Sequence, residues 1–411
     1  MSQPLPRLRA NLDFMPSPVP EQPGLLIRDP FHYSDVTLIF PPPLVECLAL
    51  FDGEQTGLDL RAALVRITGD FQVGDLEASL IDSLDRSGFL ENETFEGLRE
   101  VRHKEFAAAP TRAAAHAGSA YPGERGELVE TMRAYMEPDE PEAAPSAGSG
   151  DIFAIAAPHV SPEGGWQSYQ AAYRAMPKEA DGLTFVVLGT SHYGAPERFG
   201  LTRKQFVTPF GETPVDQPLT DYLMRHASPA IVMEDYCHAV EHSIEFQVLF
   251  LQHLYGPSIR ILPILCGSYA RSIYEGGMPE DDEYVRRFLG TLGDLSAREG
   301  SRLFWVLGID MAHMGRRYGD PFSAEAERGE MLSVGARDRE RIDRINRADH
   351  TGFWDRVQEN HDDLKWCGSS PLYTFLRAAP RGRGSLRRYE QWNIDGESVV
   401  SFAGIAFSRD A

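Results

Sequence analysis

A pattern of two histidines and a glutamate with metal-binding spacing lies at residues 238–242, which read HAVEH. Two histidines four residues apart lie on one face of a helix and can bind one cation. Inverted zinc peptidases use this H-x-x-E-H order to hold zinc and activate water. Such a site also needs a third ligand from a second helix, and no acidic helical partner is recognisable. We therefore expect the match to be coincidental, with His238 an incidental surface residue and with His242 and Glu245 facing a nearby cleft.

Three further histidines share one position, because each follows an apolar run that is typical of a β-strand. They are His159 after 152–158, His192 after 183–191, and His313, with Asp310, after 302–309. In open α/β sheets ligands bind beyond the carboxyl ends of the strands, so these side chains should meet at one edge. Imidazole binds Fe, Cu, Zn and Ni well. A single histidine after a strand is usually structural, but three at equivalent positions indicate a metal site.

The apolar runs alternate with helical patterns. A further strand is predicted at 259–267, and helices are predicted at 164–176, 217–226, 241–255 and 282–299. Strands that alternate with helices predict an α/β sheet covered by helices on both faces. We assign residues 115–411 to one α/β domain. Within it, the acidic and proline-rich stretch 137–150 lacks periodicity and is predicted to be a flexible loop.

The chain before this domain has a different pattern. Residues 1–23 are proline-rich and are predicted to be extended, whereas 24–105 predict two short strands, three short helices and a final strand. This order favours a small winged-helix-like domain. It resembles the PqqD-like, peptide-recognising type of winged helix in the stretches LIRDP (26–30), LFDGEQTGLDL (50–60) and LIDSLDRSGFL (80–90). The alternative is a generic docking domain.

Composition limits the classes of function. The 411 residues carry a formal net charge of −21, so the surface repels phosphate backbones, and we expect neither nucleic acid nor a membrane as a partner. No secretory signal and no apolar run of about 18 residues is present, which predicts a cytoplasmic protein. The four cysteines are scattered without CxxC spacing, as expected for reduced thiols: Cys47, Cys237, Cys266 and Cys367.

Eight separated motifs carry a resemblance to a known family. They are AHAGSAYPG (115–123), APH (157–159), VLGTSH (187–192), TPFGETPVD (208–216), EHSIEFQVLFL (241–251), ILPILCG (261–267), GIDMAHMG (308–315) and CGSSPL (367–372). Together they resemble the MEMO family, also called AmmeMemoRadiSam system protein B. The resemblance implies a fold like that of the class III extradiol dioxygenases of the LigB type, which bind non-haem iron at this edge of the sheet.

The resemblance also implies roles for individual residues. The metal-binding histidines of the family fall on His159 and His192, and its cysteine ligand falls on Cys367. Its S-D-x-x-H motif falls on Asp310 and His313, the latter in the position of the general base of the related dioxygenases. With His242 in the cleft, the expected catalytic residues are His313, Asp310 and His242. The expected cofactor is Fe(II) or Cu, because a thiolate ligand is soft, and Zn is a further candidate.

The sequence departs from the family pattern at two of these motifs. The common H-A-G-Y is here His159-Val-Ser-Pro, so a tyrosine is missing and Trp166 follows a few residues later. The common C-G-R-H-P is here Cys367-Gly-Ser-Ser-Pro, which lacks the arginine and the histidine. With less positive charge beside it, Cys367 should ionise less readily in the absence of a metal.

Two classes of function remain open. One is a metal-dependent redox enzyme in which His313 moves a proton and Asp310 orients it, acting on a small molecule or peptide. The resemblance implies AMMECR-type and radical SAM proteins as partners in a modification pathway. The other is a non-catalytic module that binds metal or peptide in the old dioxygenase cleft. A zinc hydrolase stays open only if HAVEH binds metal, and no P-loop or GxGxxG motif supports a nucleotide site.

Overall fold

The computed structural model describes residues 3–137 and 151–409, so the predicted flexible loop at 137–150 lies outside the described residues except for Glu137. The chain divides into two compact units, Met1–Ala108 and Ala109–Ala411. Each unit has its own elements and its own buried core. Within the described ranges, no helix is long and apolar enough to cross a membrane.

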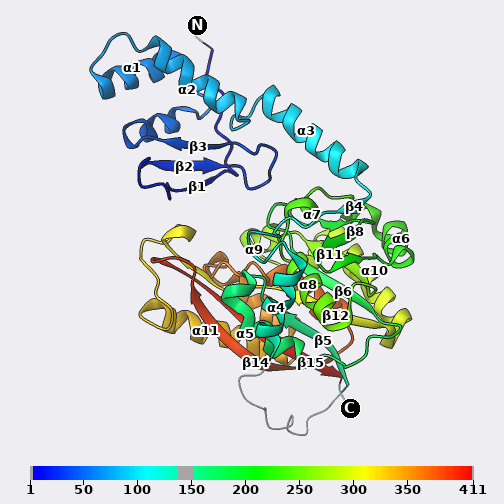
Figure 1. Ribbon diagram of the computed structural model, residues 1–411. Coiled ribbons are helices and arrows are strands. Elements are labelled where there is room, and N and C mark those ends of the chain that lie inside the picture. The colour runs from blue at the N-terminus through cyan, green and yellow to red at the C-terminus, as the bar shows by residue number, and fades with distance from the viewer. Residues whose placement is uncertain (1–2, 138–150, 410–411) are drawn as a thin grey trace. The chain divides into compact units, whose positions relative to one another are not determined.

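The first unit combines a small antiparallel sheet with helices (Figure 1). Its elements are β1 (Asp13–Pro16), β2 (Leu25–Arg28), β3 (Thr37–Phe40), the 3-10 helix η1 (Pro42–Leu50), α1 (Gly57–Thr68), α2 (Gly74–Arg86) and α3 (Glu93–Ala108). Helix α1 begins at a capping box of Thr56 and Asp59 and ends at Gly69, whose φ of 71° suits glycine. The predicted final strand is reduced to a single bridge between Leu8 and Leu90.

The proline-rich start of the chain belongs to the core of this unit. Leu5 and Leu12 are buried in the same cluster as Ile27 of β2. The buried guanidinium of Arg9 pairs with Asp29 at 2.9 Å, so the two charges neutralise each other away from water. These contacts anchor the extended segment through apolar burial and one ion pair.

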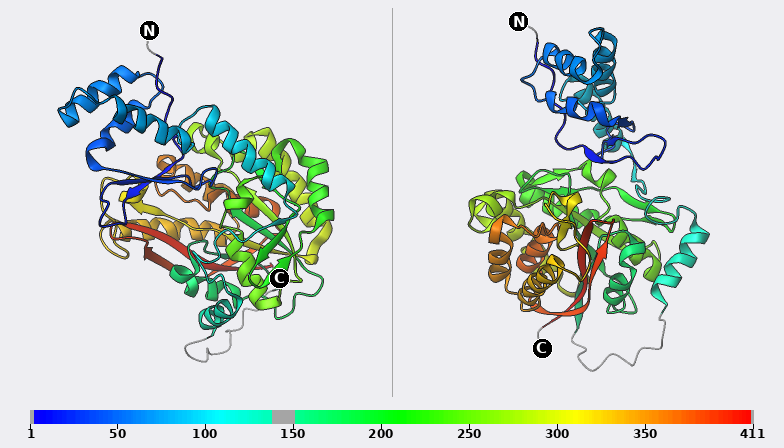
Figure 2. Two further views of the ribbon diagram at one scale, coloured as in Figure 1. Left: turned by 45° about the horizontal axis from the view of Figure 1, so that its top comes forward. Right: turned by 90° about the vertical axis from the view of Figure 1, so that its left-hand side faces the viewer.

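The second unit is built on a mixed nine-stranded sheet with the order β10-β7-β11-β6-β12-β5-β15-β13, with β14 paired to β15 (Figures 1 and 2). The strands are β5 (Ile152–Ala157), β6 (Thr184–Thr190), β7 (Phe199–Leu201), β10 (Ile231–Met233), β11 (Arg260–Cys266), β12 (Leu303–Gly308), β13 (His313–Gly315), β14 (Gly382–Asn393) and β15 (Ser398–Arg409). The four predicted strands form its parallel centre, β11-β6-β12-β5. A separate small sheet contains β4 (Thr111–Arg112), β8 (Gln205–Thr208) and β9 (Gly211–Thr213).

Helices cover both faces of this sheet, which confirms the predicted α/β class. One face packs on α4 (Arg125–Met136), α5 (Pro162–Tyr173) and α8 (Glu245–Tyr255), and the other packs on α6 (Gln217–Ala227), α10 (Glu283–Glu299), α12 (His350–Gln358) and α13 (Ser369–Ala378). The remaining helices of four or more residues are α7 (Cys237–Val240), α9 (Ala270–Glu275) and α11 (Glu330–Asn346). Alternate residues of each central strand belong to the two cores. In β12, for example, Trp305 faces one core and Val306 faces the other.

Two glycines at the carboxyl ends of central strands let the segment before α8 approach the sheet. A Cβ at Gly189 of β6 would lie 2.6 Å from Cγ1 of Ile244 and would also crowd the Ser243 hydroxyl. A Cβ at Gly308 of β12 would overlap the backbone carbonyl oxygen of Ser243. Glycine at both positions therefore sets how closely the 241–245 segment sits against the strand ends.

Replacing Gly308 by alanine should destabilise the second unit, because backbone rather than a flexible side chain occupies the space of the new Cβ. We expect the free energy of unfolding to fall by ~1–3 kcal/mol, as for overpacked cores. The matched control is Gly290→Ala in α10, where the structure leaves the Cβ position open. That change should leave stability equal or raise it by ~0.5–1 kcal/mol. Equal effects in thermal unfolding of the two variants would contradict the proposed close approach.

Candidate metal centre

Three histidines from separate segments converge at the carboxyl edge of the central sheet. His159 follows β5, His192 follows β6, and His242 lies in the connection between α7 and α8. Each offers a ligand atom, and these atoms all lie within 4.8 Å of one another. The ring centroids are 5.0 Å apart for His159 and His192 and 5.1 Å apart for His159 and His242. The predicted meeting of strand-end histidines is therefore present for His159 and His192.

A single buried carboxylate orients two of these rings. Oε1 of Glu241 accepts from Nδ1 of His192 at 3.0 Å and lies 3.3 Å from Nδ1 of His242. The backbone N–H groups of His192, His242 and Ser243 also donate to Glu241. Because Nδ1 of His192 donates to the carboxylate, its Nε2 carries the lone pair when the ring is neutral. A carboxylate behind a histidine in this way is the usual means of orienting a metal ligand.

His159 is oriented by the backbone instead. Its Nδ1–H donates to the carbonyl oxygen of Gly308 at 3.0 Å, which leaves Nε2 as the lone-pair nitrogen. Its own backbone N–H donates to Oδ1 of Asp310 at 2.9 Å. The other oxygen of Asp310 is 3.5 Å from Nε2 of His159. Asp310 therefore supports His159 from the end of the neighbouring strand β12.

The three rings and Glu241 form one electrostatic unit. Burial by itself raises the pKa of Glu241, but the charge and hydrogen bonds of His192 outweigh it and hold that pKa below its ordinary value. Burial lowers the pKa of His192, yet the attraction of Glu241 and a hydrogen bond with Cys367 raise it well above its usual range. For His242, burial and the charges of the other histidines outweigh Glu241, and its pKa falls well below the ordinary value. Of these two rings, His192 therefore holds a proton more readily than His242.

Cys367 lies directly beside the histidines, just before α13. Its Sγ is 3.2 Å from Nε2 of His159 and 3.7 Å from the carbonyl oxygen of Asp310. Burial raises the pKa of the thiol, but the charges and hydrogen bonds of His159 and His192 lower it below the ordinary value overall. The thiol thus ionises more readily than the missing arginine and histidine of its motif led us to expect, because the strand-end histidines supply the positive charge.

Asp310 and His313 lie behind the cluster rather than among its possible ligands. Asp310 is buried, and burial raises the pKa of its carboxyl to about 6. His313 begins β13, and its Nδ1 faces the carbonyl oxygens of Met311 at 2.9 Å and Lys365 at 3.1 Å. Burial lowers the pKa of His313, although the charge of Asp310 opposes that shift. Both groups interact electrostatically with each other and with His192.

Two expectations about the opening motif are wrong. His238 is a buried residue and not a surface one, because α7 packs against β7 and brings its Nε2 within 3.0 Å of the Gly200 carbonyl oxygen. Glu245 does not face the cleft. It is buried as the first residue of α8 and accepts hydrogen bonds from Arg112, from the Tyr121 hydroxyl and from two backbone N–H groups. The predicted helix at 241–255 begins only at Glu245, which leaves His242 on the loop before it.

The network around Glu245 fixes the loop that carries Glu241 and His242. Arg112 of β4 is buried and donates 2.7 Å hydrogen bonds to the carbonyl oxygens of His238 and Glu241. Nε2–H of His116 donates to the Val240 carbonyl oxygen at 3.0 Å, and the His116 ring packs edge-on against His242. The sequence patterns did not indicate a role for Arg112 or His116, or the orienting role of Glu241. His116 and Glu241 could have been found from the sequence, because each lies in one of the motifs that carry the family resemblance.

A small pocket opens beside the histidines. It has a volume of about 260 Å³ and includes both His192 and Cys367 in its wall. The remainder of the wall mixes hydroxyl, aromatic and charged side chains with backbone, namely Thr190, Ser191, Gly194, Ser268, Tyr269, Ile273, Trp354, Asp362, Lys365, Trp366, Ser369 and Ser370. A pocket of this size admits a small polar molecule next to the cluster.

Comparison with known proteins agrees with the motif-based resemblance. A family model described as "Memo-like protein" matches residues 112–406. A MEMO1 family protein of Aquifex aeolicus is 27% identical over 387 residues, which is 93% of this chain and 95% of that protein. Another from Methanosarcina mazei is 28% identical over 239 residues, 57% of this chain and 77% of that protein. Because the first match covers 93% of this chain, the aligned region includes most of the N-terminal unit, Met1–Ala108.

Replacing Glu241 by glutamine should lower the pKa of His192 in the metal-free protein. The carboxylate charge is what raises that pKa, and the burial that remains acts in the opposite direction. We expect the His192 pKa to drop from well above 6.5 to below it, followed by NMR titration of the histidine ring protons. His238 is an internal control, because burial, which outweighs the opposing charge of Asp235, lowers its pKa to about 4 and Glu241 is not among the causes. An unchanged His192 titration would show that Glu241 does not govern the cluster.

Proposed function

The chain belongs to the Memo-like family, and from this we propose that it holds a redox-active transition metal between His159, His192 and His242 and acts on a small molecule beside it. The observation that carries the proposal is that the ligand atoms of these three histidines lie within 4.8 Å of one another. In the modification pathway that the family resemblance implies, we expect a radical SAM protein to be a partner.

The residues present fit a metal of this class. Three imidazoles suit Fe, Cu and Zn, and the nearby thiol of Cys367 is a soft donor that favours Cu and Fe(II). Hydrogen bonds hold Nδ1 of His159 and of His192, so Nε2 is the nitrogen of each ring that would bind a cation. Nε2 of His159 lies 3.2 Å from Sγ of Cys367, which a cation at this position would also approach. Such a metal would supply Lewis-acid activation or one-electron chemistry to a bound ligand.

The assignment of the third ligand differs from the one that the family motif implies. His242 belongs to the set whose ligand atoms lie within 4.8 Å of one another, and Cys367 does not. We therefore propose His242 as the third ligand and Cys367 as a thiol beside the metal. In that position the thiol of Cys367, within 3.2 Å of His159, faces the pocket where a ligand would sit.

The surrounding side chains have complementary tasks in this proposal. Glu241 and the Gly308 carbonyl fix the ring orientations, and Asp310 supports His159. With its pKa raised to about 6, Asp310 can exchange a proton near neutral pH. His313 is the candidate for moving a proton between this buried region and the outside, because it is half-buried and coupled to Asp310.

One observation favours metal binding without turnover as a second candidate. Sγ of Cys367 lies so close to Nε2 of His159 that it can become a fourth protein ligand. Sites with four protein ligands are closed to substrate and serve structural or storage roles, whereas catalytic sites keep one position open. The two candidates therefore differ in whether Cys367 binds the metal.

Metal content after anaerobic purification distinguishes the ligand sets. We expect His159→Ala and His242→Ala to weaken metal binding by about tenfold or more, because each removes a direct ligand. Cys367→Ser should retain the metal if three histidines suffice. His253→Ala is the matched control, since His253 is half-buried on α8 and outside the cluster. Loss of metal in Cys367→Ser but not in His242→Ala would reverse the assignment of the third ligand. No metal bound by the wild-type protein would refute the site.

Turnover is tested separately with the metal-loaded protein. We expect oxygen consumption with thiol, catechol or peptide mixtures, and we expect it to be lost in His313→Gln while metal content stays at the wild-type level. The physical reason is that His313 moves a proton without binding the metal. Oxygen uptake by electrode and metal content by emission spectrometry give the two readouts. A metal-loaded protein that consumes no oxygen with any of these would support the non-catalytic candidate.

A further inference from the structure

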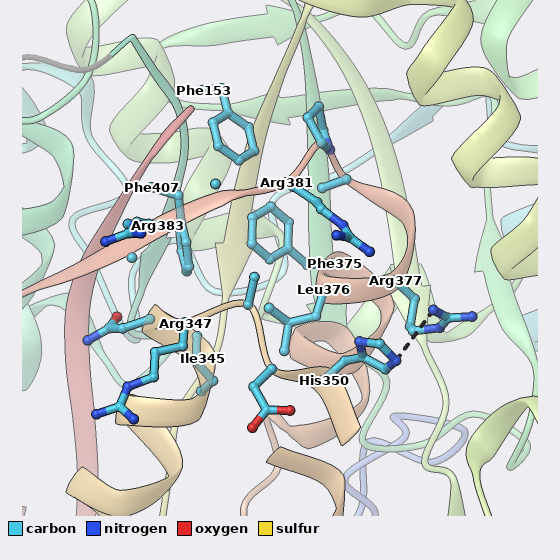
Figure 3. A pocket seen from close by; sticks show the side chains of 17 residues that line it. Phe153, Ile345, Arg347, His350, Phe375, Leu376, Arg377, Arg381, Arg383 and Phe407 are labelled. Carbon is cyan, nitrogen blue, oxygen red and sulfur yellow. Dashed lines mark hydrogen bonds between the residues drawn. The ribbon is translucent and has the colours of Figure 1, made fainter. Parts of the chain in front are cut away.

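A second, larger pocket lies at the opposite edge of the sheet from the histidines. Its volume is about 890 Å³. It is formed by the start of β5, the ends of α11 and α13, the starts of α12 and β14 and the end of β15. Figure 3 shows Arg347 and Arg383 on one side of three phenylalanine rings and Arg377 and Arg381 on the other.

This pocket is distinct from the metal centre. Phe153 lines it near the start of β5, whereas His159 follows the end of the same strand. The six-residue separation corresponds to ~20 Å along an extended strand. None of the three clustered histidines and no residue of the smaller pocket contributes to its lining.

The pocket concentrates positive charge in a chain whose formal net charge is −21. Four arginines line it, and only one carboxylate, Asp349, does so. Asp349 already pairs with Arg344 at 3.0 Å and caps α12. In the described ranges, the side chains of Arg347 and Arg381 have neither an ion pair nor a hydrogen bond.

Two other residues of the wall, Arg377 and His350, have partners inside the protein. Arg377 pairs with Glu280 at 3.0 Å and lies 3.4 Å from Nε2 of His350. Burial and then the charges of Arg377 and Arg381 lower the pKa of His350, which keeps this ring neutral at the pocket wall. A neutral imidazole between arginines can still donate a hydrogen bond to a ligand.

Two features next to Arg347 indicate a built site. Ala348 adopts a φ of 53°, which is strained for a residue with a side chain and is typical of functional positions. Oδ1 of Asn346 is buried and has no hydrogen-bond partner in the described part of the chain. Buried amide oxygens without a donor are rare, which sets this part of the pocket wall apart from an ordinary surface loop.

We propose that this pocket binds a phosphorylated small molecule. Arginine recognises phosphate by paired, charge-assisted hydrogen bonds. Arg347 and Arg381 are the two arginines of the lining whose N–H donors make no hydrogen bond within the described part of the chain. The volume falls within the range of small-molecule sites. The strongly acidic surface elsewhere repels long phosphate polymers, so a compact phosphate ligand fits better than a nucleic acid.

The opposing explanation is that the arginines offset the negative ends of helices. The carboxyl ends of α11 and α13 both reach the pocket, and cations there stabilise a helix without any ligand. This explanation accounts for Arg377, which lies within α13. It does not account for the unpartnered oxygen of Asn346. The two explanations differ in what they predict for ligand binding.

The test is calorimetric titration of the full chain with ribose 5-phosphate at about 0.15 M salt, where weak surface attraction is screened. We expect binding that Arg381→Gln and Arg347→Gln each weaken by about tenfold or more, the effect of losing a charge-assisted hydrogen bond. Arg387→Gln is the matched control, because Arg387 is exposed on the neighbouring β14 and does not line the pocket. It should leave the affinity within about twofold, since exposed charges contribute little.

Several outcomes would overturn the proposal. They are the absence of ribose 5-phosphate binding, equal binding of sulfate, or an equal loss of affinity in Arg387→Gln. His159→Ala should bind ribose 5-phosphate as the wild type does. Loss of binding in that variant would place the ligand at the metal centre instead and would likewise overturn it.

Discussion

The burial of one carboxylate, that of Glu241, is the constraint on which the candidate site depends. A buried charge is costly unless it is paired and hydrogen-bonded, and Glu241 meets this need with His192, His242 and three backbone N–H groups. Each of these partners has to be in place for the carboxylate to be tolerated. The carboxylate consequently fixes the orientation of the rings. The segment that carries it is held by a hydrogen bond from Arg112 to the Glu241 carbonyl oxygen, and it can approach the sheet closely because Gly308 has no side chain.

The same arrangement sets the chemistry that the cluster can support. Three imidazoles this close cannot all be protonated, and the pKa shifts separate them into a charged His192 and a neutral His242. A cation that binds here competes with a proton at His192 but meets a neutral ring at His242, which lowers the cost of binding there. The thiol of Cys367 lies in the same field, and its pKa falls for the same reason. Metal affinity, thiol reactivity and ring orientation are therefore aspects of one electrostatic balance.

The fold could be predicted from the sequence where the apolar patterns were strong. Residues of the candidate site could be predicted only where their position follows from those strands. The four central strands are continuous apolar runs, as parallel strands buried on both faces must be. The long β14–β15 hairpin was not predicted, because β14 reads GRGSLRRYEQWN and has no apolar run. His238 and Glu245 were misplaced for a related reason. Helical spacing predicts which residues share a face, but it does not show that α7 ends before Glu241 and that a loop separates it from α8.

By itself, the sequence determined that His159 and His192 stand at the ends of buried strands, and the topology of parallel sheets then brings these ends to one edge, where β12 separates the two strands. It also determined the family, through motifs that are local in the chain. Only the tertiary structure decided that His242 joins them, that Glu241 orients two rings, and that Arg112 holds their loop, because these contacts link residues as many as 133 positions apart. The arginine-lined pocket is likewise a feature that only the tertiary structure decided. Its walls come from six elements that no local pattern connects, namely β5, α11, α12, α13, β14 and β15.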